Sequence, residues 1–122
     1  MSERISQAEL DVMEVIWRGA PIAATDVASE LSAKKDWSIR TVKTLLARLV
    51  EKGAVSTQKD GRRFLYRPII DRQTYVGGAA TRLVDKLFGG RAAPLVAQLA
   101  ESKTLTAEDI AELEAIIQDL KS

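Results

Sequence analysis

One stretch, residues 38–68, constrains the fold more than any other part of this chain. Its first half is predicted to form an amphipathic helix, because apolar residues recur at helical spacing at Val42, Leu45, Leu46 and Leu49. Ser38 is suited to begin this helix, since a serine side chain can accept a hydrogen bond from the first free backbone N–H groups. Gly53 is suited to end it, because glycine adopts positive φ without strain.

Two short strands are predicted directly after this helix, over residues 55–59 and 63–67. Asp60-Gly61 stands between them, and this dipeptide is a strong β-hairpin signal. In the second strand Phe64 and Tyr66 alternate with Leu65 and two arginines, so one face can pack while the other stays in water. Pro68 is expected to end the strand. The stretch therefore reads as a helix followed by a β-hairpin.

The same stretch concentrates the positive charge of a nearly neutral protein. The whole chain has a formal net charge of +1, whereas residues 34–67 contain ten basic and three acidic residues, a net charge of +7. The flanks are acidic, at −4 for residues 1–33 and −2 for residues 68–122. Positive charge confined to one helix and one hairpin predicts a surface that binds a polyanion such as double-stranded DNA.

Two more helices are predicted before this stretch. Ser6 and Glu9 form a capping-box pattern that begins a helix over residues 7–17, and Thr25 and Asp26 are expected to cap a short helix after it. Three helices followed by a hairpin are the order of a winged helix-turn-helix. We therefore predict a mainly α fold with a small β-hairpin wing, in which the third helix lies in the major groove of DNA.

Three further amphipathic helices are predicted in the C-terminal part, over residues 72–88, over residues 93–100 and after residue 106. A segment of this size cannot bury all of its apolar stripes alone. We therefore expect a DNA-binding domain over residues 1–70 and a helical dimerisation domain over residues 71–122. The side chains expected at the dimer interface are Leu83, Leu87, Ile110, Leu113, Ile116, Ile117 and Leu120.

Candidate DNA-binding residues lie at the start of the third helix and in the wing. Arg40 and Lys43 can donate hydrogen bonds to guanine, and a threonine methyl group can touch the methyl group of thymine. Other candidates on and before this helix are better suited to phosphates, and the basic residues near the tip of the hairpin are expected to reach the DNA backbone or a minor groove. The complete candidate set is Lys35, Ser38, Arg40, Thr41, Lys43, Thr44, Arg48, Lys59, Arg62 and Arg63.

The composition excludes several kinds of site. The chain has no cysteine and no histidine, so the usual zinc and copper sites and the usual Cys–His nucleophile pairs cannot be built. No catalytic residue, metal or cofactor is predicted, and the protein is not expected to be an enzyme. No apolar run approaches 18 residues and the N-terminus has no apolar signal-peptide core, which predicts a cytoplasmic protein without membrane insertion.

With these motifs the chain resembles the penicillinase-repressor (BlaI/MecI) family of bacterial winged-helix repressors over essentially its full length. The resemblance rests on ISQAELDVMEVIW at 5–17, SIRTVKTLLARLVEKGAV at 38–55 and RRFLYRP at 62–68. It implies a homodimeric repressor of palindromic operator DNA. It also implies release from the operator when an antirepressor membrane protease acts during cell-wall antibiotic stress.

Two departures from the family leave the inducing signal open. The resistance-associated members are cut at an Asn-Phe bond, but this chain has no asparagine and its matching region reads FGGRAAPLVAQL at 88–99. Copper-responsive relatives carry a C-terminal cysteine cluster, which is absent here. The competing interpretation is a winged helix used as a protein-interaction adaptor without an operator. Such an adaptor has no need of the basic residues on the third helix and wing.

Overall fold

The computed structural model describes residues 4–122, which divide into two compact units, one up to Val76 and one from Gly77 onward. The first unit contains α1 (Gln7–Gly19), β1 (Ile22–Ala23), α2 (Ala24–Leu31), α3 (Ile39–Glu51), β2 (Val55–Asp60), β3 (Arg63–Pro68) and the start of α4 (Arg72–Phe88). The second contains the rest of α4, α5 (Ala92–Glu101) and α6 (Ala107–Lys121). The predicted winged helix followed by helices is confirmed.

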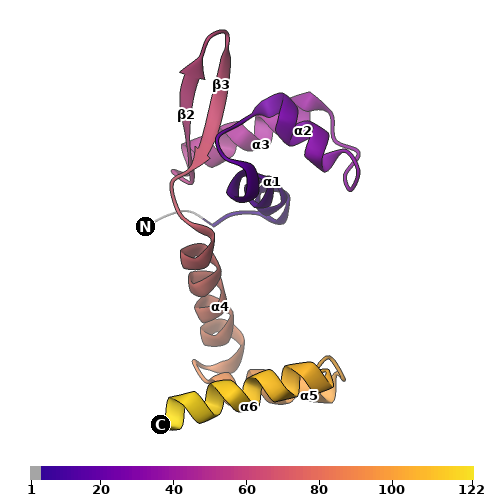
Figure 1. Cartoon of the computed structure of the whole chain (residues 1–122), viewed down its shortest axis with the longest axis vertical. Coiled ribbons are helices and arrows are strands. Elements are labelled where there is room, and N and C mark those ends of the chain that lie inside the picture. The colour runs from indigo at the N-terminus through magenta and orange to yellow at the C-terminus, as the bar shows by residue number, and fades with distance from the viewer. Residues whose placement is uncertain (1–3) are drawn as a thin grey trace. The chain divides into compact units, whose positions relative to one another are not determined.

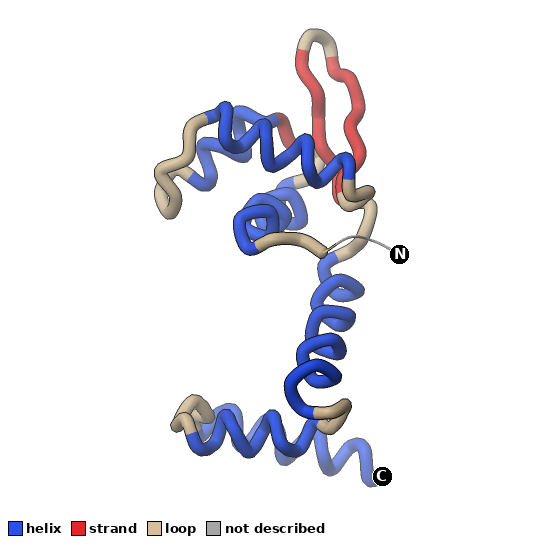
Figure 2. Tube along the Cα trace, turned by 180° about the vertical axis from the view of Figure 1, so that it is seen from behind, coloured by secondary structure: helices blue, strands red, loops and turns tan. Residues whose placement is uncertain are grey.

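In the first unit, α1, α2 and α3 pack around one hydrophobic core. Met13 and Ile16 of α1, Val27 of α2, and Leu46 and Leu49 of α3 are all fully buried in it. Figure 2 shows these three helices gathered at the base of the hairpin. The apolar stripe predicted for α3 is therefore its core-facing side, which leaves the opposite side to the solvent.

The hairpin is the main part of a three-stranded antiparallel sheet with strand order β1-β3-β2. It projects beyond the three helices (Figure 1). Ile22 of β1 pairs with Tyr66 of β3, which attaches the base of the hairpin to the chain between α1 and α2. Sequence analysis missed β1, because a strand of two residues shows no alternating pattern.

The predicted ends of α3 and of the hairpin are confirmed, with one change. Ser38 accepts a hydrogen bond from the backbone N–H of Thr41 at 3.1 Å, and Gly53 has a φ of 77°. In the hairpin, Asp60 pairs with Arg63. The two-residue turn is therefore Gly61-Arg62 rather than Asp60-Gly61.

The capping expected for α2 is wrong. Thr25 and Asp26 lie inside the helix, and Ala23 occupies the N-cap without a side-chain hydrogen bond. The physical reason is that β1 runs directly into α2, so pairing of Ala23 with Leu65 of β3 fixes the entry of the chain. The capping boxes predicted at Ser6 and Thr106 are both present.

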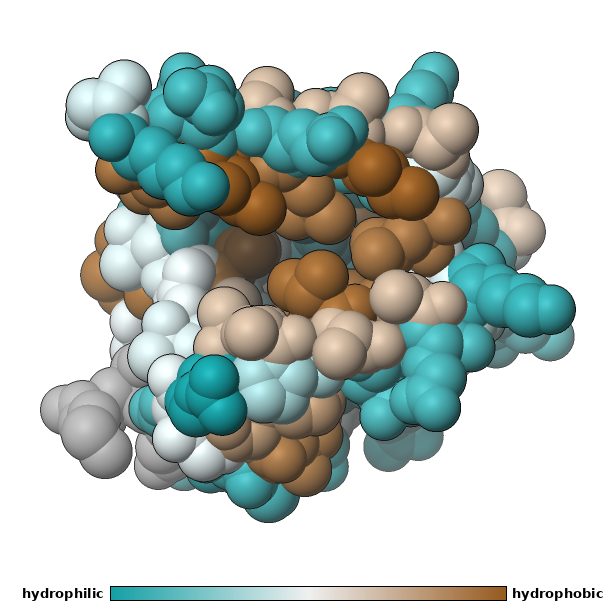
Figure 3. Space-filling model, turned by 90° about the horizontal axis from the view of Figure 1, so that it is seen from below, coloured by the Kyte–Doolittle hydropathy of each residue, from teal (hydrophilic) through white to brown (hydrophobic). Residues whose placement is uncertain are grey.

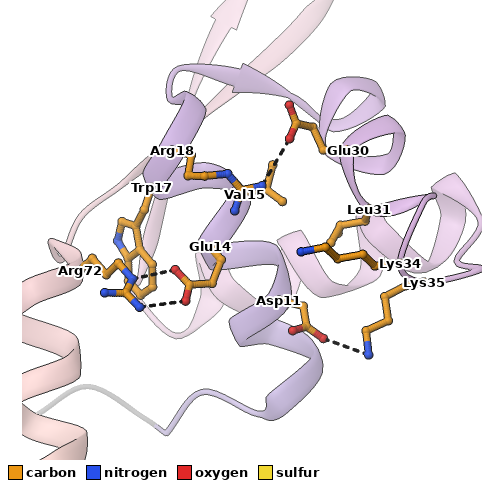
Figure 4. A pocket seen from close by; sticks show the side chains of 10 residues that line it. All are labelled: Asp11, Glu14, Val15, Trp17, Arg18, Glu30, Leu31, Lys34, Lys35 and Arg72. Carbon is orange, nitrogen blue, oxygen red and sulfur yellow. Dashed lines mark hydrogen bonds and ion pairs between the residues drawn. The ribbon is translucent and has the colours of Figure 1, made fainter. Parts of the chain in front are cut away.

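Three ion pairs connect α1 to its neighbours around a groove of about 500 Å³ (Figure 4). They join α1 to α2, to the α2–α3 turn and to the start of α4, at Arg18–Glu30 (3.3 Å), Lys35–Asp11 (3.6 Å) and Arg72–Glu14 (2.8 Å). The hydrogen bond from Arg72 holds the pKa of Glu14 below its ordinary value. Each acid that lines the groove is thus used to connect elements.

The first turn of α4 is part of the first unit. The indole N–H of Trp17 donates to the carbonyl oxygen of Ile70 at 2.9 Å, and the rings of Trp17 and Tyr75 lie 5.8 Å apart between centroids. The division into units therefore falls after Val76, inside α4, whereas the sequence placed a boundary between residues 70 and 71.

The second unit has no closed core. No residue from 77 to 122, a range described throughout, is buried. Seen from below, in Figure 3, hydrophobic side chains lie exposed at the surface. A groove of about 330 Å³ lies between α5, α6 and the loop that joins them. Its lining is mainly apolar and includes Leu99, Leu113 and Ile116, with Asp109 and Glu112 beside them. Within residues 4–122 no helix has both the length and the apolar character needed to cross a membrane.

Candidate nucleic-acid interface

The exposed side of α3 presents the residues predicted to read DNA. Arg40, Thr41, Lys43 and Thr44 are all exposed in its first half. Five basic side chains on α3 and the wing have no carboxylate of residues 4–122 within ion-pairing distance. They are Arg40, Lys43, Arg48, Lys59 and Arg62. Exposed cations without internal counterions are available to an external anion.

The hydroxyl groups of this segment are mostly used locally. Ser38 is the N-cap of α3, and its hydroxyl also lies 3.2 Å from that of Thr41. Thr44 donates its hydroxyl hydrogen to the carbonyl oxygen of Arg40 at 3.0 Å. This leaves Thr44 the apolar contact with thymine that its methyl group can make.

Two candidates have internal partners. Lys35 pairs with Asp11 of α1 and lies over the ring of Trp37, at 5.8 Å from the ring centroid. It lines the groove beside α1, on a different part of the first unit from the wing residues. Arg63 pairs with Asp60 within the hairpin at 3.4 Å, and both side chains are more than half exposed. An exposed pair of this kind is weak, so Arg63 can exchange Asp60 for another anion.

Three of the candidates, Lys43, Arg62 and Arg63, meet at a hollow of about 300 Å³ between α3, the start of α2 and β3, which we call the wing notch. Lys43, Arg62, Arg63, Phe64 and Thr25 are among the residues that line it. It brings together basic residues that lie about twenty positions apart in the sequence. Arg40 and Arg48 do not line it.

Phe64 was not a predicted site residue. The alternation in β3 predicted a packing face for Phe64 and Tyr66 together, but only Tyr66 packs against the core, while Phe64 is 51% exposed. Phe64 pairs with Lys59 near the turn, beyond the reach of the core. Its place among basic residues on the wing was the only signal that could have marked it.

A buried ion pair holds the far end of α3. Lys52 donates to the carboxylate of Glu9 at 2.6 Å and to the backbone carbonyl of Arg4 at 2.8 Å. Burial acts to raise the pKa of Glu9, but hydrogen bonds from Lys52 and from the Ser6 backbone outweigh it, and the pKa lies below its ordinary value. Lys52, which the sequence count placed in the basic stretch, is therefore neutralised internally.

Comparison with known proteins agrees with this arrangement. A family model described as penicillinase repressor matches residues 5–119. A penicillinase repressor from Bacillus licheniformis is 37% identical over 119 residues, which are 98% of this chain and 93% of that protein. The methicillin resistance regulatory protein MecI from Staphylococcus aureus strain N315 is 31% identical over 113 residues, or 93% of this chain and 92% of that protein.

A solved structure of a protein–DNA complex matches part of the chain. It is a solution structure of the Bacillus licheniformis BlaI monomeric form in complex with the blaP half-operator. The match has 45% sequence identity and a TM-score of 0.54, and it covers 62% of this chain and 92% of that one. The similarity therefore extends to a protein that was solved while bound to DNA.

Proposed function

The chain belongs to the penicillinase repressor family, a family of DNA-binding repressors, and from this membership we propose that it is a homodimeric transcriptional repressor of a palindromic operator. The observation that carries the proposal is the set of exposed cations on α3 and the wing that have no carboxylate partner within residues 4–122. A protein with a net charge of +1 concentrates its positive charge where a winged helix meets DNA.

In this proposal the N-terminal half of α3 enters the major groove. Arg40 is exposed in the first turn of α3 and can donate two hydrogen bonds to a guanine. Thr41 and Thr44 face the same groove. Arg48 and Lys59 contact phosphates, which adds affinity but no sequence information.

The second unit supplies the dimer. Six of the seven predicted interface residues are exposed in the single chain, with Leu120 at 80%, and Leu113 is half-buried beside the α5–α6 groove. Apolar side chains so exposed favour burial against a second copy. A twofold dimer presents two copies of α3 to the two halves of a palindromic site.

Release from the operator is part of the same proposal. The protein acts in the cytoplasm during cell-wall antibiotic stress, and a membrane protease or another signal separates the dimer. The loop before α5 offers an exposed segment, since Gly89 and Gly90 both have positive φ and are exposed. The Asn-Phe bond of related repressors is absent, so any cleavage uses a different bond.

The proposal is tested by recovering genomic DNA fragments on the purified protein, sequencing them, and titrating the most enriched duplex. With about six to ten phosphate contacts per dimer, affinity should fall by about 10³–10⁵ between 50 and 200 mM salt. Absence of DNA binding at low salt, or a response that is independent of salt, would instead support the adaptor interpretation.

A further inference from the structure

The wing notch places Lys43 with the wing rather than with Arg40. Lys43 lies on α3, yet it lines the same hollow as Arg62, Arg63 and Phe64 of the hairpin. Arg40, three residues earlier, does not line this hollow. The two α3 cations therefore face different surroundings, although sequence analysis assigned both to base reading.

The chemistry of the notch fits one repeating unit of the DNA backbone. Three cations border the hollow: Lys43, Arg62 and Arg63. Among residues 4–122, the one carboxylate within ion-pairing distance of these three cations is Asp60, which makes a weak pair with Arg63 at 3.4 Å. The volume of about 300 Å³ leaves room for a phosphate with its sugar, and contacts to phosphate and sugar position a protein on DNA without carrying sequence information.

Phe64 supplies the apolar part of this site. Its side chain is 51% exposed and does not pack in the core. It lies on the side of β3 that faces α2 and α3. The carbon face of a deoxyribose is an apolar partner for such a ring, and it lies next to the phosphate that the cations attract. The exposed hydroxyl of Thr25, also at the notch, can donate to the same phosphate.

We infer that the wing notch holds one DNA backbone unit, with its phosphate between Lys43 and the wing arginines and its deoxyribose on Phe64. Lys43 is then a positioning residue, and Arg40 is the cation of α3 that reads sequence. The inference rests on the proposed function, because it names the part of the DNA that this surface takes.

The experiment compares the enriched operator duplex with a scrambled duplex of equal length and composition. Lys43→Ala should weaken binding to both duplexes by the same factor and lower the salt slope by about 0.9 for each copy of the protein. Phe64→Ala should also weaken both duplexes equally but leave the slope unchanged, because a sugar contact releases no counterion. Arg40→Ala should weaken the operator alone and so reduce the ratio of the two affinities.

Lys103→Ala is the matched control, since it removes the same charge from the α5–α6 loop, and it should change neither affinity. Lys43 and Phe64 are exposed, so thermal melting of both variants should follow the parent protein. A loss confined to the operator in Lys43→Ala would overturn the inference and return Lys43 to base reading. Unchanged binding in Phe64→Ala would overturn the sugar contact. If the parent protein binds neither duplex, the proposed function itself has failed.

Discussion

The two units of this chain differ in how far they bury their apolar residues. Within residues 4–122, all fifteen hydrophobic residues that form the buried core lie in the first unit, and none lies between 77 and 122. The last helix of the second unit, α6, nevertheless begins with a complete capping box made by Thr106 and Asp109. Local signals therefore specify both units, but only the first is completed by contacts within one chain. The second leaves its apolar side chains exposed, and in the proposed dimer a second copy covers them.

The largest expected effect comes from a substitution in the α5–α6 groove of the second unit. Leu113→Asp should place a charge in the proposed interface, which costs several kcal/mol of desolvation and should leave the protein monomeric at micromolar concentration. Operator affinity should then fall steeply, because a single half-site holds one copy weakly. Sedimentation beside an operator titration measures both effects. The control is Gln118→Asp, which makes the same kind of change at an exposed polar position of α6.

Two results would contradict this account of the dimer. A Leu113→Asp protein that remains dimeric shows that the interface lies elsewhere. One that is monomeric yet binds the complete operator with the parent affinity shows that dimerisation does not contribute to repression.

A substitution in the core of the first unit should lower the stability of each single chain, whatever the protein concentration. Leu46 is fully buried, so Leu46→Ala should cost about 2–5 kcal/mol of the free energy of unfolding, through lost transfer energy and a cavity. Urea unfolding should show the same loss at every protein concentration. Ile116→Ala, in the second unit, should leave the unfolding of the first unit unchanged. A concentration-dependent loss in Leu46→Ala would contradict a self-contained first unit.

The buried pair between α1 and α3 predicts a dependence on pH. The pKa of Glu9 is lowered in the folded state from 4.5, so its stabilisation is present above that pH and is lost as the pH falls through the lowered value. Glu9→Gln should therefore cost about 1.5–3 kcal/mol at neutral pH. The difference from the parent protein should shrink below pH 4.5. Glu101→Gln, which changes an exposed carboxylate, is the control, and an equal cost at pH 7 and at pH 3 would refute the charge-based account.

The smallest expected effect is at Gly77, the first residue of the second unit. A Cβ built there meets no atom within 4 Å, so Gly77→Ala should stabilise α4 by about 0.8–1.0 kcal/mol. Gly53→Ala should have the opposite sign, because its φ of 77° is a conformation that glycine adopts without strain and alanine does not. Thermal melting with sedimentation tests both. A Gly77→Ala protein that is less stable and less dimeric would show that a second copy approaches α4 at this position.

Local patterns in the sequence were enough for most of the helices and for the hairpin. α4 begins and ends where the sequence predicted, and Ser38 caps α3 as expected. These features depend on residues a few positions apart, which a single sequence displays directly. The fold class followed from the order of these elements.

Contacts between distant residues were not predictable in this way. Glu9 and Lys52 are separated by 43 positions, and Trp17 and Ile70 by 53. Nothing in the spacing of either pair indicates that the two residues meet. The same limit explains the missed exposure of Phe64, since the alternation in β3 gives its face but not how far the core extends beneath it.

The attachment of Lys52 to the start of α1 has a thermodynamic consequence for DNA binding. The ammonium group of Lys52, the C-cap residue of α3, binds the carboxylate of Glu9 and the carbonyl of Arg4, so the conformational entropy of α3 is already lost during folding. Association then does not have to order this helix, and preorganisation of this kind favours affinity. In calorimetry the heat-capacity change should correspond to the buried interface alone, without the additional negative contribution of a helix that folds on contact.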